Sequence, residues 1–219
     1  VSLARAFATQ PALLLLDEPF SALDAPTHAA LLDDFHDLLA ATRQTTVLVT
    51  HDLDEAALLA DRLAVLLNGR LAQVGAPEAI FAAPADEAVA VFVGMETRIP
   101  GEVVAEQDGR VAVVPQFAPG LRLFAATGAA VSGPVLLCLR PEDVTISLTE
   151  SPGNTLPGRS TRLTVQGPLV RLTVDVGLPL NALVTRSTAR ELGLQVGQLV
   201  FASFLPHAAH LLPPRTLQT

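Results

Sequence analysis

Residues 1–94 alternate short apolar runs with stretches in which apolar side chains recur every three or four positions. The run at residues 13–16 predicts a buried strand, and residues 45–50 predict a second strand. Residues 26–41 carry leucines and a phenylalanine on one side and aspartates on the other, which predicts an amphipathic helix. A second helix, capped at its start by an aspartate, is expected over residues 52–60. Strands that alternate with helices predict an α/β fold with a parallel sheet.

The pattern changes near residue 94. Before that point Asn68-Gly69 separates two short apolar segments and is a strong hairpin signal. After it, apolar segments punctuated by glycine and proline predict a small all-β barrel, with one short helix at residues 187–192. The predicted strands of both parts span residues 63–67, 70–74, 101–105, 110–115, 135–139, 160–165, 169–176, 182–185, 199–205 and 209–212. We therefore expect two domains, residues 1–94 and 95–219.

Charge separates the same two parts. Residues 1–94 hold four arginines against thirteen acidic residues, a net charge of −9, whereas residues 95–219 hold ten arginines against nine acids, or +1. An acidic first part without a basic patch, and an aromatic content of 4%, argue against nucleic acid as a partner. The single cysteine, Cys138, lies in an apolar stretch, which predicts a buried, unreactive thiol and fits a reducing compartment. No apolar run approaches the eighteen or so residues of a membrane span.

Two adjacent carboxylates, Asp17 and Glu18, directly follow the run at residues 13–16, and His51 follows the next predicted strand. Ligands of open α/β sheets bind at the carboxyl ends of the strands, where these side chains are expected to meet. For hydrolysis of magnesium-bound ATP, Asp17 would enter the magnesium shell through water, Glu18 would be the general base, and His51 would contact the γ-phosphate. Taken singly, the apolar run could be only a structural strand and His51 a surface or core histidine. Their joint placement favours catalysis.

These residues resemble the ATP-binding subunits of ABC transporters. In that family the run ending in Asp17-Glu18 corresponds to the Walker B motif, Ser21-Ala22-Leu23-Asp24 to the D-loop, His51 to the switch histidine, and residues 1–6 to the helix after the signature sequence. The resemblance implies ATP and Mg²⁺ as cofactors, with Ser21 and Asp24 beside the nucleotide. It also implies a homodimer that sandwiches ATP, membrane permease subunits, a solute-binding protein, and a cytoplasmic position on the inner face of the cell membrane.

All fourteen basic residues counted as Lys or Arg are arginine. A Walker A loop requires a lysine, so this loop and the signature glycines are expected to be absent from the chain. Because Met95 is the only methionine, we interpret the chain as N-terminally truncated. The chain by itself is expected to bind ATP weakly and to be inactive as an ATPase.

Residues 95–219 resemble the transport-associated oligonucleotide/oligosaccharide-fold (TOBE) domain, with Leu139-Arg140-Pro141-Glu142-Asp143-Val144 as the most specific match. Within it, Arg140 could contact a ligand or form a salt bridge to Glu142 or to the neighbouring domain. The later part resembles the molybdate-binding kind of this domain. The matching stretches are residues 153–158, 174–177, 183–187, 192–194 and 203–204.

The oxyanion site of that family is altered here. Its Ser-Ala-Arg-Asn stretch is Ser151-Pro152-Gly153-Asn154 in this chain, and its lysine after Ser-Phe is Leu205. A dianion could still be held by backbone N–H groups and hydroxyls, with Asn154, Ser187 and Thr188 as candidates. Capping of the short helix explains Ser187 and Thr188 at least as well.

The predicted function is the ATP-hydrolysing subunit of an ABC importer for an inorganic oxyanion, tungstate or molybdate before sulfate. Iron or polyamine import is the alternative, because related regulatory domains follow those ATPases too. Two other classes stay open: a free-standing oxyanion-binding protein that uses only the β domain, and an ABC-type ATPase outside transport. The acidic first part and the appended barrel disfavour the last of these.

Overall fold

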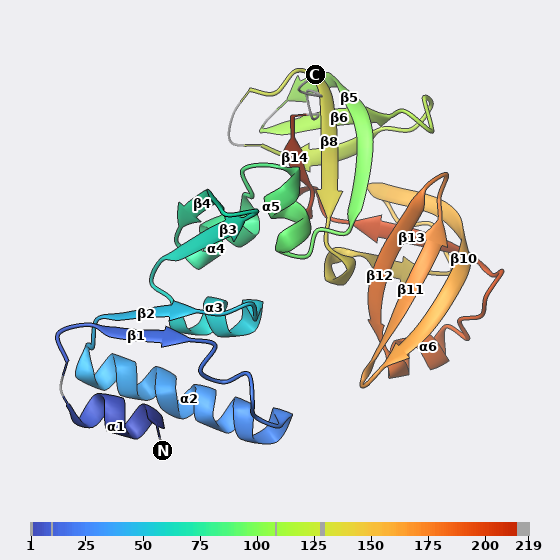
Figure 1. Cartoon of the computed structure of the whole chain (residues 1–219). Helices are drawn as coiled ribbons and strands as arrows, with labels where there is room; N and C mark the ends of the chain where they lie inside the picture. The colour runs from blue at the N-terminus through green and yellow to red at the C-terminus, as the bar shows by residue number, and fades with distance from the viewer. Residues whose placement is uncertain (1, 10, 108, 128–129, 214–219) are drawn as a thin grey trace. The chain divides into compact units, whose positions relative to one another are not determined.

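The computed structural model describes residues 2–9, 11–107, 109–127 and 130–213 (Figure 1). The chain divides into two compact units. Unit 1 comprises residues 1–65 and 74–80, and unit 2 comprises residues 66–73 and 81–219. Among the described helices, none combines the length and the apolar character needed to cross a membrane.

Unit 1 is built on two parallel strands, β1 (Leu14–Asp17) and β2 (Thr46–Val49), whose register runs from Leu14 opposite Thr46 to Asp17 opposite Val49. Helices α1 (Ser2–Ala8), α2 (Ala25–Thr42) and α3 (Leu53–Leu59) accompany them. The buried cluster of this unit consists of Phe20, Leu32 and Phe35, with Phe7, Leu16, Leu31, Leu39 and Leu59 packed against it. The predicted α/β arrangement is confirmed, but the prediction of a buried strand at residues 13–16 is wrong for this chain, because Leu13 and Leu15 are 47% and 69% exposed.

Both longer helices of unit 1 begin at an aspartate cap. The Asp24 carboxylate accepts a backbone N–H of the first turn of α2, and the Asp52 carboxylate accepts two from the first turn of α3. Such caps satisfy donors that have no partner inside the helix. The predicted helices at residues 26–41 and 52–60 are confirmed, with α2 one residue longer at each end.

A hairpin follows, formed by β3 (Leu63–Leu67) and β4 (Arg70–Gly75). Its turn residues Asn68 and Gly69 have φ values of 51° and 72°, the left-handed conformation that primed hairpin turns require and that Asn-Gly adopts readily. Two short helices come next, α4 (Pro77–Ala82) and α5 (Glu87–Phe92). The hairpin signal is confirmed.

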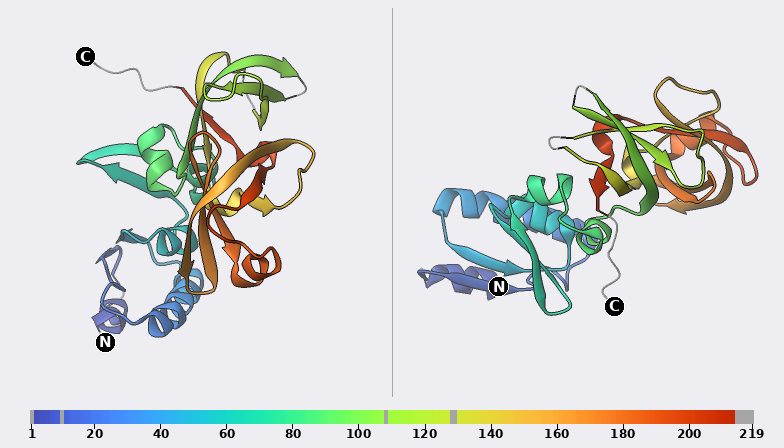
Figure 2. Two further views of the ribbon diagram at one scale, coloured as in Figure 1. Left: turned by 90° about the vertical axis from the view of Figure 1, so that its right-hand side faces the viewer. Right: turned by 90° about the horizontal axis from the view of Figure 1, so that it is seen from above.

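Unit 2 contains two five-stranded sheets (Figures 1 and 2). The first has the order β14-β8-β5-β6-β7 and the second the order β12-β11-β10-β13-β9. Their strands are β5 (Thr97–Gln107), β6 (Arg110–Pro115), β7 (Leu123–Ala126), β8 (Gly133–Leu139), β9 (Thr145–Ser147), β10 (Asn154–Gln166), β11 (Leu169–Asp175), β12 (Pro179–Thr185), β13 (Leu199–Phe204) and β14 (His210–Leu212). Helix α6 (Arg186–Glu191) follows β12.

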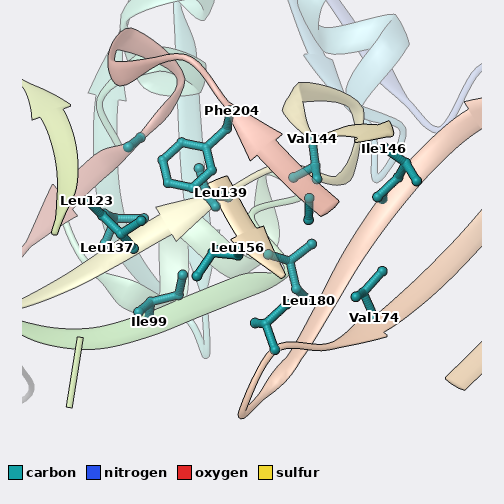
Figure 3. Close-up of a cluster of buried hydrophobic side chains, with 14 of the residues drawn as sticks. Ile99, Leu123, Leu137, Leu139, Val144, Ile146, Leu156, Val174, Leu180 and Phe204 are labelled. Carbon is teal, nitrogen blue, oxygen red and sulfur yellow. The ribbon is translucent and has the colours of Figure 1, made fainter. Parts of the chain in front are cut away.

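One hydrophobic cluster joins these two sheets. Leu137 and Leu139 of the first sheet and Leu156 and Leu180 of the second are buried in the same cluster (Figure 3). The long strands β5 and β10 curve (Figure 2), and each has a register shift, at Val103–Ala105 and at Ser160–Arg162. Bulges of this kind bend a strand and increase its twist, which lets the sheets curl around a shared core. The predicted small β domain is confirmed.

The segment before β5 packs with the β strands. Ala90 of α5 and Met95 are buried together with Cys138 of β8 and Leu212 of β14. The guanidinium of Arg140 donates hydrogen bonds to the carbonyl oxygens of Phe81, at 2.7 Å, and of Val93. The residues from Phe81 onward belong to unit 2, whereas the sequence analysis places its boundary after residue 94.

The sequence analysis recovers part of this β domain. Strands β6, β8 and β11 are confirmed close to their predicted bounds. It misses β7 and β9, and it predicts only residues 160–165 of β10, because Pro157-Gly158 lies near the start of that strand. Glycine is needed at residue 158, since a Cβ there would lie 2.5 Å from Val174 Cγ1 and 2.7 Å from the carbonyl oxygen of Asp175.

Candidate functional site

The chain leaves the edge of the parallel sheet at Glu18, and the backbone of this residue has an unusual conformation. Its N–H donates to the carbonyl oxygen of Val49 at 2.8 Å, so the chain is still held to β2 one residue beyond the end of β1. Its φ is +46°, a left-handed conformation that is uncommon for a residue with a Cβ. Backbone strain of this kind is concentrated at functional sites, where it aims a side chain.

The structure brings Glu18 and His51 into direct contact. His51 Nδ1 donates to Glu18 Oε1 at 2.7 Å, although 33 residues separate them in sequence. The hydrogen bond to the Glu18 carboxylate, reinforced by its charge, raises the pKa of His51, and Asp52 and Glu55 act in the same direction. The His51 side chain is 80% exposed and that of Glu18 34% exposed, so both can be reached from solvent. Asp17 is exposed at the end of β1.

Ser21 and Asp24 lie in the turn between β1 and α2. Ser21 Oγ donates to the carbonyl oxygen of Glu18 at 2.9 Å and so closes the turn. Hydrogen bonding with Thr27 at the start of α2 lowers the pKa of the Asp24 carboxyl. One short segment, from the end of β1 to the start of α2, therefore carries four of the predicted site residues, Asp17, Glu18, Ser21 and Asp24.

A second histidine–carboxylate contact lies in the same unit and is missing from the sequence analysis. His28 Nε2 donates to Glu55 Oε1 at 2.7 Å, and Glu55 is only 3% exposed. One possible ligand atom from each of His28, Asp52 and Glu55 lies within 4.8 Å of the others, a spacing that could hold a cation. The direct Nε2–Oε1 hydrogen bond and the helix cap at Asp52 account for this grouping without one. No local sequence spacing signals the pair, because 27 residues separate its members.

In the β domain, Asn154 is 2% exposed, and its Oδ1 and its Nδ2 each make one hydrogen bond to the backbone. Its Oδ1 accepts the N–H of Phe124 at 2.6 Å and its Nδ2 donates to the Phe124 carbonyl oxygen at 2.7 Å. This side chain therefore fastens the start of β10 to β7, an edge strand that the sequence analysis misses.

Ser187 and Thr188 lie in the first turn of α6, on a different element from Asn154. Thr185, which the sequence analysis does not single out, is the cap of this helix and accepts the N–H of Thr188 at 3.1 Å. The hydroxyls of Ser187 and Thr188 hydrogen-bond to that of Thr185 at 2.7 and 2.9 Å. Oxyanion binding by Asn154, Ser187 and Thr188 stays a prediction that these local contacts do not test.

Unit 2 also contains a hollow at its surface and a buried cysteine. An apolar hollow of about 400 Å³ lies beside α6 and is lined by residues that include Leu163, Val170, Arg186 and Arg190. Cys138 is fully buried, and burial raises the pKa of its thiol to about 12, which confirms the prediction of an unreactive cysteine.

Comparisons with known proteins give matches to the β domain and to nearly the whole chain. A family model described as the TOBE domain matches residues 150–211. The chain is 37% identical over 217 residues to the molybdate/tungstate import ATP-binding protein WtpC of Pyrococcus horikoshii, which covers 97% of this chain and 60% of that protein.

Two further relatives have other printed substrates. The sulfate/thiosulfate import ATP-binding protein CysA 2 of Chromobacterium violaceum is 38% identical over 205 residues, covering 91% of this chain and 54% of that protein. The Fe(3+) ions import ATP-binding protein FbpC of Serratia marcescens is 42% identical over 150 residues, covering 68% of this chain and 41% of that protein. The chain thus spans at most about 60% of the length of these relatives.

Proposed function

The chain belongs to the family of ABC importer ATP-binding proteins with a C-terminal TOBE domain, and we propose from this that Glu18 and His51 form the hydrolytic centre of an ATPase. The observation that carries the proposal is the 2.7 Å contact between Glu18 Oε1 and His51 Nδ1 at the carboxyl edge of a parallel sheet. Edges of this kind are where α/β sheets bind their ligands.

In this proposal Glu18 is the general base. A carboxylate oxygen of Glu18 takes the proton of a water molecule that attacks the terminal phosphate of ATP. His51 keeps Nδ1 on Glu18, which leaves Nε2 free to hydrogen-bond a phosphate oxygen. Because the pKa of His51 is raised, its ring stays protonated to a higher pH and can donate from Nε2 as well as from Nδ1.

Asp17 is the proposed magnesium residue. An exposed carboxylate at the end of β1, one residue before the base, suits a hard cation that prefers oxygen ligands and retains much of its water. Bound Mg²⁺ would neutralise charge on the phosphates. Ser21 and Asp24 are proposed to line the nucleotide from the adjoining turn, where Asp24 would meet a second copy of the chain.

The proposed substrate is an inorganic oxyanion, tungstate or molybdate before sulfate. Relatives named for molybdate/tungstate match 97% and 93% of this chain, and relatives named for sulfate/thiosulfate match between 60% and 98% of it. Relatives named for iron and for spermidine/putrescine match only 68% and 72% of it. The two molybdate/tungstate relatives therefore match more of this chain than the iron and polyamine relatives do. Iron or polyamine import stays the alternative, and a free-standing oxyanion-binding protein would need only that domain.

The partners proposed for the whole protein are those of an import system. The relatives are ATP-binding proteins of importers, which supports ATP and membrane permease subunits as partners. We extend this to a homodimer on the inner face of the cell membrane and, indirectly, a solute-binding protein.

The test is Glu18→Gln in the intact ATPase of the transporter. Loss of the base is expected to lower kcat by roughly 10²–10⁴-fold while ATP still binds. The matched control is Asp34→Asn, which removes the same charge from the exposed side of α2. Hydrolysis that persists in Glu18→Gln, or falls equally in the control, would refute the assignment of the base.

A further inference from the structure

We propose that His28 is a positioning residue that, through Glu55, couples the segment after Glu18 to the helix after His51 and so sets the Glu18–His51 contact. The proposal rests on the proposed function, because it matters for turnover only if Glu18 and His51 are catalytic. It adds a role for His28 and Glu55, neither of which touches Glu18 or His51 in any hydrogen bond of the described residues.

On one side, His28 is fixed to the segment that follows Glu18. Its backbone N–H donates to the carbonyl oxygen of Asp24 at 2.8 Å in the first turn of α2. Its ring meets that of Phe20 edge to face, with 5.9 Å between the ring centroids. Phe20 is 1% exposed, lies two residues after Glu18, and packs against Phe35. Movement of the His28 ring therefore requires movement of this buried segment.

On the other side, Glu55 fixes the start of α3. Its N–H donates to Asp52 Oδ1 at 3.1 Å, and the N–H of Asp52 donates to Thr50 Oγ1 at 3.0 Å. His51 lies between Thr50 and Asp52, so the backbone on both sides of His51 belongs to this network. Displacement of Glu55 would be transmitted to His51 through these two hydrogen bonds.

The hydrogen bond between His28 and Glu55 links the first turns of the two helices, and breaking it costs free energy. Glu55 Oε2 is buried and has no hydrogen-bond partner in the described part of the chain, so the carboxylate relies on the 2.7 Å bond that His28 Nε2 donates to Oε1. A buried carboxylate that loses its partner pays its full desolvation cost, so the first turns of α2 and α3 are held together.

The first test uses this chain and does not depend on turnover. His28→Leu removes the donor at similar volume, whereas His28→Gln retains a side-chain N–H that can reach Glu55. Glu55 itself is unchanged in both variants, so the two differ in the contact that residue 28 makes with it. The ring signals of His51 in NMR spectra are expected to shift toward those of a free histidine in His28→Leu and to return in His28→Gln. His36→Leu, on the exposed side of the same helix, is the control and is expected to leave them unchanged.

The second test measures ATP hydrolysis by the intact ATPase at a temperature at which all variants are folded. His28→Leu is expected to lower kcat roughly tenfold or more with little change in the KM for ATP, because misplacement of reacting groups slows the chemical step. His28→Gln is expected to restore kcat. Should His28→Leu fail to fold, His28→Asn, whose amide is too short for the contact, takes its place with the same expectations.

A lower melting temperature without any change in the His51 signals or in kcat would show a purely structural pair and overturn the proposal. If Glu18→Gln retains turnover, the proposed function fails, but the NMR comparison still decides whether His28 positions His51. Shifted His51 signals in His28→Leu that His28→Gln does not restore would also count against the Nε2–Oε1 bond as the link.

Discussion

Units 1 and 2 bury their apolar side chains in different ways. In unit 2, Leu137 and Leu172 are fully buried in one cluster that both five-stranded sheets share. In unit 1, apolar side chains of the parallel strands are exposed. Leu15 of β1 is 69% exposed, and Val47 and Val49 of β2 are 50% and 55% exposed. Parallel strands are usually covered on both faces. Unit 2 therefore encloses the larger apolar core, whereas the proposed chemistry lies on unit 1, whose strands are less covered.

The largest effect that tests this comparison is expected from Leu172→Ala. Removing a fully buried leucine leaves a cavity and should lower the free energy of unfolding of unit 2 by about 3 kcal/mol. Leu15→Ala removes the same atoms from an exposed position in unit 1 and should change stability by less than about 0.5 kcal/mol. Urea unfolding of both variants measures the difference, and equal losses would contradict the contrast between the units.

A smaller effect is expected from Gly158→Ala in β10. The new Cβ would approach Val174 Cγ1 and the Asp175 carbonyl oxygen to within 2.7 Å, so the strands must shift, at a cost of about 2 kcal/mol. Gly120→Ala is the matched control, because a Cβ there has no atom within 4 Å. Thermal unfolding compares the two, and an unchanged melting temperature in Gly158→Ala would show that the close approach of β10 and β11 tolerates a side chain.

The smallest effect concerns the exposed pair of unit 1. NMR titration should give His51 a pKa above its ordinary value, and Glu18→Gln should bring it down, because the Glu18 hydrogen bond is the main cause of the shift. A raised pKa means that any stability from this pair is present at low pH and is lost as the pH rises through the folded-state pKa of His51. Glu78→Gln removes a charge elsewhere in unit 1 and should leave the titration unchanged. If the pKa of His51 is unchanged in the Glu18→Gln variant, the contact is absent in solution.

Sequence patterns predict what depends on neighbours in the chain. The Asp52 cap, the Asn68-Gly69 turn and the strand leading to Asp17 each carry a local signal, and the structure contains all three. The contact of Glu18 with His51 follows from a general rule, because parallel strands end at the same edge. The catalytic roles of these two residues stay predictions.

Features that depend on distant parts of the chain are not predicted. Asn154 is a candidate ligand residue in the sequence analysis, yet its carboxamide is bound to the backbone of a strand 30 residues away. The pairing of His28 with Glu55 leaves no periodic signal at all. The hydrogen bonds of Arg140 to the carbonyl oxygens of Phe81 and Val93 likewise join residues that are far apart in the sequence.

The left-handed backbone conformation of Glu18 affects which substitutions natural variation accepts at this position. At φ +46° glycine or asparagine would relieve the strain, so stability alone favours replacing this glutamate. Either replacement would delete the carboxylate that faces His51. Residue 18 is therefore a position where stability and turnover select in opposite directions, and a copy of this protein that has lost its ATPase activity should drift there toward glycine or asparagine.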